Sequence, residues 1–80
     1  MELGNYKVKD HMIDDFNSRF SNYGDDLKDF IFDFKSKKEV WNEMSYRIEF
    51  YNTKSTFKDS ITKSVPVEKV SWFENYFIKI

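Results

Sequence analysis

Carboxylates are the side chains of this sequence with the most scope for chemistry. The candidates are six aspartates: Asp14, Asp15, Asp25, Asp26, Asp29 and Asp33. Their spacing lacks the central glycine and the closing glutamate of a calcium loop. A glycosidase-like pair needs a deep cleft, which a chain of 80 residues seldom forms. If residues 25–33 are helical, the four later aspartates lie on one side of that helix.

A helical row of aspartates has two interpretations. It is most often a solvated helix face, because acids near a helix N-terminus interact favourably with the macrodipole. It can also imitate the phosphates of a nucleic acid and pair with the lysines and arginines of a basic groove. We therefore treat the six aspartates as a candidate acidic binding face for a nucleic-acid-acting protein.

Other reactive constellations are missing from the sequence. His11 is the only histidine and there is no cysteine, so neither a His-pair metal site nor a thiolate nucleophile can form within one chain. Gly4 and Gly24 are the only glycines, which is too few for a phosphate-binding loop. The sequence predicts a protein that is not an enzyme and has no catalytic residue, metal site or cofactor.

Charge is divided between the two parts of the chain. Residues 1–34 carry eight acids and four bases, whereas residues 35–80 carry six acids and nine bases. The basic part also holds Tyr46, Tyr51 and Phe57, on which bases of a single strand could stack. Direct nucleic-acid binding is therefore the alternative function, although Arg19 and Arg47 are the only arginines.

Aromatic residues are unusually frequent, at 20% of the chain. A small core gains much apolar area from each ring, so most of them are expected inside. Sixteen rings are many for one small core, which favours either a homodimer or an exposed aromatic patch. We take Trp41, Trp72 and Tyr76 as candidate anchors for a partner, because Trp and Tyr are enriched at binding hot spots.

Hydrophobic spacing predicts an N-terminal helix over 10–23, capped by Asp10 and ended by Gly24. Residues 25–35 fit either a helix or a strand at 29–34, and periodicity does not decide between them. A capping box at Ser36–Glu39 predicts a second helix over 37–45, which could extend over 26–51.

The second half alternates in its hydrophobicity. Tyr46, Ile48 and Phe50 predict one strand of a β-hairpin over 46–62, and Pro66 suits the first turn of a C-terminal helix over 66–78. The expected fold is a small α+β domain spanning residues 1–80, with a mainly α three-helix bundle as the alternative. The apolar face of the hairpin should pack against Val70, Phe73 and Phe77.

Together these features predict a small, non-enzymatic protein-binding module. Its small size, its lack of cysteine and its A/T-rich coding favour an inhibitor of a host nucleic-acid-acting or defence protein, encoded by a phage or mobile element. A nucleic-acid-binding or regulatory protein and a structural subunit of a larger complex are the alternatives. Neither a secretory signal nor an apolar membrane span is evident, so a cytoplasmic location without membrane association is expected.

Overall fold

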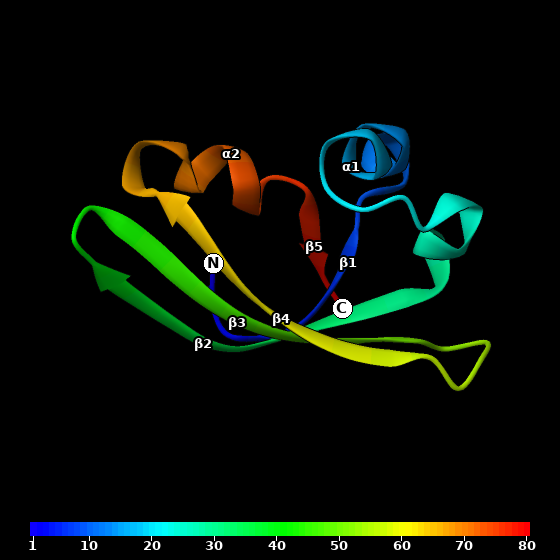
Figure 1. Ribbon diagram of the computed structural model, residues 1–80. Coiled ribbons are helices and arrows are strands. Elements are labelled where there is room, and N and C mark those ends of the chain that lie inside the picture. The colour runs from blue at the N-terminus through cyan, green and yellow to red at the C-terminus, as the bar shows by residue number, and fades with distance from the viewer.

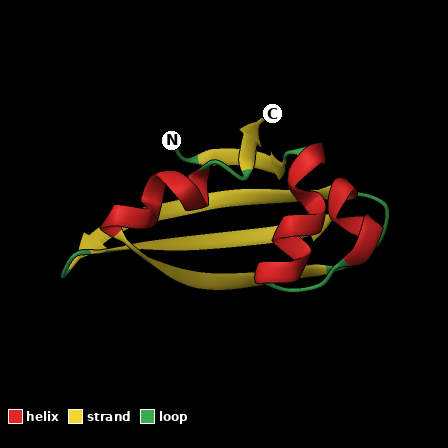
Figure 2. Ribbon diagram, turned by 90° about the horizontal axis from the view of Figure 1, so that it is seen from above, coloured by secondary structure: helices red, strands yellow, loops and turns green.

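The computed structural model describes residues 1–80 and is built on one antiparallel sheet of five strands (Figure 1). In spatial order the strands are β4 (Lys58–Pro66), β3 (Glu43–Asn52), β2 (Phe30–Val40), β1 (Gly4–Val8) and β5 (Phe77–Lys79). Helices α1 (Ile13–Arg19) and α2 (Val70–Glu74) are short and cover the same face of the sheet (Figure 2). The predicted α+β fold with three helices is therefore wrong, and so is the three-helix bundle.

The sheet is organised around the meander β2–β3–β4. Alternation places Phe30, Phe32 and Phe34 of β2 on the concave face, beneath the helices, beside Ile48 and Phe50 of β3. A bulge between Phe34 and Ser36 then shifts the register of β2. The two strands expected over 46–62 are present as β3 and β4, with longer bounds, and the strand alternative for 29–34 is the beginning of β2.

A tight turn occupies the place of the predicted helix over 37–45. Val40 pairs with Glu43, so Trp41 and Asn42 form a two-residue connection between β2 and β3. Trp41 has a φ of 51° and Asn42 has a φ of 62°, the signature of a type I′ turn. The capping-box pattern was misleading because long-range pairing along β2 and β3 outweighs a local helix signal. The extended helix over 26–51 is excluded by the same strands.

Both terminal helices are shorter than the hydrophobic spacing predicts. α1 follows a 3-10 turn at Asp10–Met12 and ends at Arg19, so Gly24 does not cap it but begins the 3-10 segment η2 (Gly24–Asp29). α2 follows the 3-10 segment η3 (Val67–Lys69), and the chain leaves the helix to form β5. The helix predicted over 66–78 therefore runs from the last residue of β4 through η3 and α2 into β5, because Phe77 continues the apolar series as a strand residue.

The core under the helices is mainly aromatic. Ten of its fourteen buried hydrophobic residues are Phe or Tyr. Phe73 of α2 packs 5.2 Å from the Tyr46 ring and 5.5 Å from the Phe77 ring, measured between centroids. The expected packing of the hairpin against the C-terminal segment is present, although Phe77 reaches it from β5. Neither helix has the length or the apolar run needed to cross a lipid bilayer.

Candidate functional site

The turn between β2 and β3 presents the most exposed aromatic side chain of the chain. Trp41 is 93% exposed, and its backbone is held at a positive φ that a bulky residue seldom adopts. Such a conformation costs on the order of 1–3 kcal/mol and persists only where the surrounding structure imposes it. Here the paired strands on both sides of the turn impose it.

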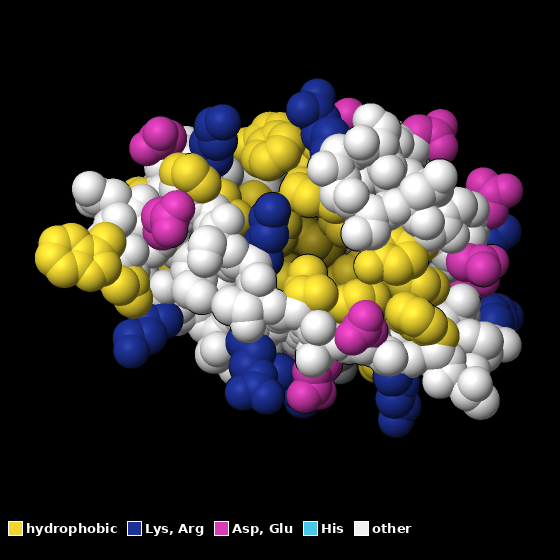
Figure 3. Space-filling model, in the orientation of Figure 1, with side chains coloured by type: hydrophobic (Ala, Val, Ile, Leu, Met, Phe, Trp, Pro, Cys, Tyr) yellow, Lys and Arg dark blue, Asp and Glu magenta, His cyan; other side chains and the backbone are white.

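Two further apolar side chains lie beside this turn. Val40 is 44% exposed and Val67 is 40% exposed, and the Val67 amide donates to the Asn42 carbonyl at 2.9 Å. We call Val40, Trp41 and Val67 the tip patch. Figure 3 shows hydrophobic side chains projecting at the end of the molecule where β2 turns into β3. An apolar patch on a protruding turn is typical of a contact surface.

Charges of both signs surround the tip patch. Glu39, Glu43 and Glu68 are exposed near Lys38 and Lys69, on the strand ends and on η3. No basic groove therefore leads to Trp41, as tracking of a phosphate backbone would require. The mixture is what the polar rim of a protein interface commonly contains.

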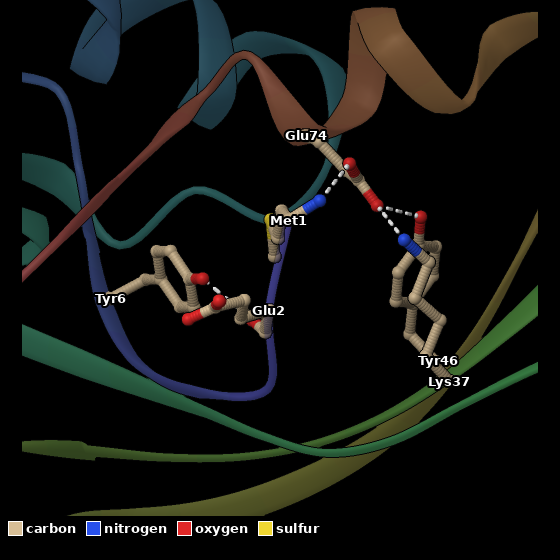
Figure 4. Close-up of polar contacts among 6 residues, drawn as sticks. All are labelled: Met1, Glu2, Tyr6, Lys37, Tyr46 and Glu74. Atoms are coloured by element: carbon tan, nitrogen blue, oxygen red, sulfur yellow. Dashed lines mark hydrogen bonds and ion pairs between the residues drawn. The ribbon is translucent and has the colours of Figure 1, made fainter.

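A hydrogen-bonded carboxylate fixes α2 over the strands that lead to the tip patch. Glu74 Oε1 accepts from the Tyr46 hydroxyl at 2.6 Å and from Lys37 Nζ at 2.9 Å, as Figure 4 shows. Glu74 Oε2 accepts from the Met1 amine at 3.3 Å. Burial opposes ionisation of Glu74, but these hydrogen bonds outweigh it and lower the pKa of its carboxyl group.

The same contacts act on the tyrosine in the opposite direction. Burial and the hydrogen bond to the Glu74 carboxylate raise the pKa of Tyr46 well above its ordinary value. Glu74 has its acceptors occupied and Tyr46 holds its proton, so the cluster is a structural tie between α2, β2 and β3. The segment η3, which carries Val67, directly precedes α2 in the chain.

A second apolar feature is the cleft between the segment that contains α1 and the segment that contains α2. Phe32, Ile48 and Phe50 form its floor, and Phe20 and Ile61 lie among its walls. The space is about 40 Å³, enough for a methyl group or a water molecule, whereas small-molecule sites usually measure about 300–1,000 Å³. Figure 3 shows this hollow near the centre of the view, with hydrophobic side chains at its floor.

The six candidate aspartates are divided between different parts of the fold. Asp14 is exposed on α1, and Asp25 and Asp26 are exposed on η2. Asp29 is half-buried at the end of η2, where its backbone carbonyl accepts from Thr53. The helical row that the sequence suggested does not exist, because residues 30–33 are part of β2.

The other two aspartates are engaged within the chain. Asp15 accepts hydrogen bonds from the Tyr76 hydroxyl and from Arg19 Nε, and both lower the pKa of its carboxyl group. Asp33 lies on the convex face of the sheet, where it pairs with Lys35 Nζ at 2.7 Å. That contact is the main cause that raises the pKa of Lys35. Three exposed aspartates near the α1–η2 end are left for an acidic binding face.

The three candidate aromatic anchors have different environments. Trp41 is free, as described, whereas Trp72 is 44% exposed and contacts Phe20, Tyr76 and Arg19. Tyr76 is fully buried, and burial followed by its bond to Asp15 raises its pKa to about 12. Tyr76 is therefore a core residue and does not present a surface to a partner.

Sequence reasoning missed the residues that accompany Trp41. Val40, Asn42 and Val67 were assigned to helices or to their ends. The available signal was the Trp41–Asn42 pair between two alternating segments, since Asn tolerates positive φ and is common in two-residue hairpin turns. No group of three His, Cys, Asp or Glu side chains is arranged to hold a metal ion.

Comparisons with known proteins found no relative of this chain. The chain matches no protein-family model, no curated protein and no solved structure.

Proposed function

We propose that this chain is a protein-binding module that engages its partner through the tip patch. The observation that carries the proposal is Trp41, which is 93% exposed on a backbone with positive φ. Neither packing nor turn geometry calls for tryptophan at this position. A binding anchor is typically a large, exposed apolar side chain. Backbone strain that the fold does not need is typical of functional sites.

A protein partner is favoured over a nucleic acid by the surroundings of Trp41. The tip patch adds Val40 and Val67 to the anchor, and its rim contains acids and bases together. A partner with an apolar pocket could receive the indole ring while its own charges pair with the rim. Truncation of a buried tryptophan anchor commonly costs about 2–4 kcal/mol of binding, or roughly 30- to 1,000-fold in affinity.

The inhibitory role expected from the sequence is a narrower form of this proposal. A module of this kind inhibits when its anchor occupies a functional groove of the target. The acidic residues Asp14, Asp25 and Asp26 would then steer the complex towards a basic nucleic-acid-acting protein. The phage or mobile-element origin of such an inhibitor remains a prediction from the sequence.

The test is affinity capture from a lysate of the organism that encodes the chain or of its host. The bait variants are wild type, Trp41→Asn and the control Ile78→Ser, which removes a 51% exposed apolar side chain on the edge strand β5. We expect one protein to be retained by wild type and by the control, and to be lost with Trp41→Asn. Equal retention by Trp41→Asn, or loss of all binding after nuclease treatment, would overturn the proposal.

The acidic face is tested separately with Asp25→Lys combined with Asp26→Lys. If these residues steer the partner, reversal should slow association several-fold at low salt, and added salt should reduce the difference. Faster association would indicate a polyanionic ligand, and no change would remove the acidic face from the interface while leaving the tip patch in place.

A further inference from the structure

The outer edge of β4 is free in this chain. β4 is the last strand of the sheet and pairs only with β3. The Asn52 amide donates to the Phe57 carbonyl, which sets the alternation of the ladder. The backbone N–H and C=O groups of Lys58, Ser60, Thr62 and Ser64 consequently point away from β3.

Little in the chain protects this edge. Of the outward N–H groups only that of Ser60 has a partner, the carboxylate of its neighbour Asp59 at 2.8 Å. Residues 58–62 are all exposed, and Ile61 is 42% exposed on the concave face. Natural sheets shield such an edge by a bulge, a proline, a short strand, a covering segment or charged side chains, and β4 carries only the last of these along its length, as Lys58, Asp59 and Lys63. β4 is nine residues long, and its proline is the last of them.

The residues of β4 are complementary to themselves in one antiparallel register. A two-fold axis at Ile61 places Asp59 opposite the second copy's Lys63 and Lys63 opposite the second copy's Asp59. It also places Ile61 opposite Ile61, Ser60 opposite Thr62 and Lys58 opposite Ser64. Registers centred on Ser60 or Thr62 instead place Ile61 opposite Asp59 or Lys63.

The charged groups that meet in this register have no ion-pair partner within the chain. Asp59 and Lys63 form none of its salt bridges, and Lys63 Nζ lies 5.2 Å from the centre of the Phe20 ring. Directly opposed side chains of an antiparallel pair have Cβ atoms about 4.5–5.5 Å apart, which lets Asp59 and Lys63 pair across the axis. The outward groups of both strands would form about eight hydrogen bonds.

We infer that the edge of β4 is a homodimer interface, in which two copies join their sheets about a two-fold axis at Ile61. The closed two-fold arrangement uses the same edge on both copies and leaves no free β4 edge for further growth. Because the strands run antiparallel, the two tip patches point in opposite directions. The inference does not rest on the function proposed above, since Trp41 lies outside the interface.

Charge reversal with compensation tests the interface. Sedimentation equilibrium of the full chain, up to about 500 µM, should show a reversible dimer for wild type. Asp59→Lys and Lys63→Asp each place like charges opposite one another and should weaken association by at least about ten-fold. The double variant Asp59→Lys with Lys63→Asp restores opposite charges and should recover the dimer.

Two control variants lie outside the edge. Glu68→Lys changes an exposed charge on η3, and Trp41→Asn removes the anchor of the tip patch; both should dimerise like wild type. Circular dichroism will show that each variant keeps the sheet. A wild-type chain that stays monomeric over the whole range, single variants that dimerise normally, or a double variant that does not recover would each overturn the inference.

Discussion

The turns at the two ends of β3 place their aromatic side chains in different environments. At one end, Trp41 stands in water on a backbone with positive φ. At the other end, Phe57 folds back so that its ring stacks on Phe30, with centroids 5.6 Å apart and planes at 22°. The second turn also satisfies its own backbone, since the Asn52 side chain accepts from the Lys54 amide at 2.8 Å.

This difference shows that aromatic content alone does not distinguish core from surface in this chain. The Phe57 turn is tied to η2 through the Asp29 carbonyl, which accepts from both the amide and the hydroxyl of Thr53. The Trp41 turn is held by strand pairing and by one bond to Val67. The first arrangement stabilises the fold, whereas the second exposes a side chain that the fold does not use.

The largest expected change in stability follows from truncating the buried ring of α2. Phe73→Ala removes a buried ring that contacts Tyr46 and Phe77, so it should reduce the free energy of unfolding by about 3–5 kcal/mol. Urea denaturation followed by circular dichroism measures the loss. A midpoint equal to that of wild type would place Phe73 outside the core.

A smaller loss is expected at the other end of β3. Phe57 is 42% exposed, so Phe57→Ala should cost about 2 kcal/mol, roughly half of the value for a fully buried ring. The same denaturation experiment measures it, with Ile78→Ser as the control for loss of an exposed apolar side chain. A cost below about 0.5 kcal/mol would mean that the two turns do not differ in the way described.

A substitution in the tip patch is expected to increase the free energy of unfolding and not to reduce it. Trp41→Asn places a residue that tolerates positive φ at the first position of a type I′ turn, so it should increase stability by about 1 kcal/mol. A higher urea midpoint together with lost partner binding would show that Trp41 is kept at the expense of the fold. Destabilisation by this change would indicate that the indole ring packs on the protein.

The smallest effect concerns pH and the tie between α2 and the sheet. Because the pKa of Glu74 is lowered in the folded state, its stabilisation is present above its unfolded value of 4.5 and is lost as pH falls through the folded value. Glu74→Gln should therefore make the urea midpoint less sensitive to pH below 4.5. Identical acid profiles for wild type and variant would contradict this.

The predictable parts of this fold are those in which local pattern and tertiary structure agree. Tyr46, Ile48 and Phe50 alternate over a regular strand, and the hairpin followed from them. β2 was ambiguous because its bulge after Phe34 interrupts the alternation, and Ser36–Glu39 then imitates a helix start. Pairing of β1 with β5 joins segments far apart in the sequence, which no local pattern reports.

The candidate site shows the same division. Residue type led to Trp41 and Trp72 as candidate anchors, and both side chains are exposed, whereas their use in binding stays a prediction. Residue type failed for Tyr76, whose burial depends on the packing of α1 against the C-terminal segment. The predicted helical row of aspartates was wrong, because Asp33 belongs to strand β2 whereas Asp25, Asp26 and Asp29 belong to the 3-10 segment η2.

The pairing of β1 with β5 has a consequence for the order of folding. Tyr6 pairs with Lys79 and Val8 with Phe77, so the loop that must close spans nearly the whole chain, whereas β2, β3 and β4 are joined by short turns. Closing a longer loop costs more entropy, so we expect the meander to form first and β5 to dock last. Hydrogen exchange should accordingly be fastest for the strand amides of β5 and slowest for those in the middle of β3.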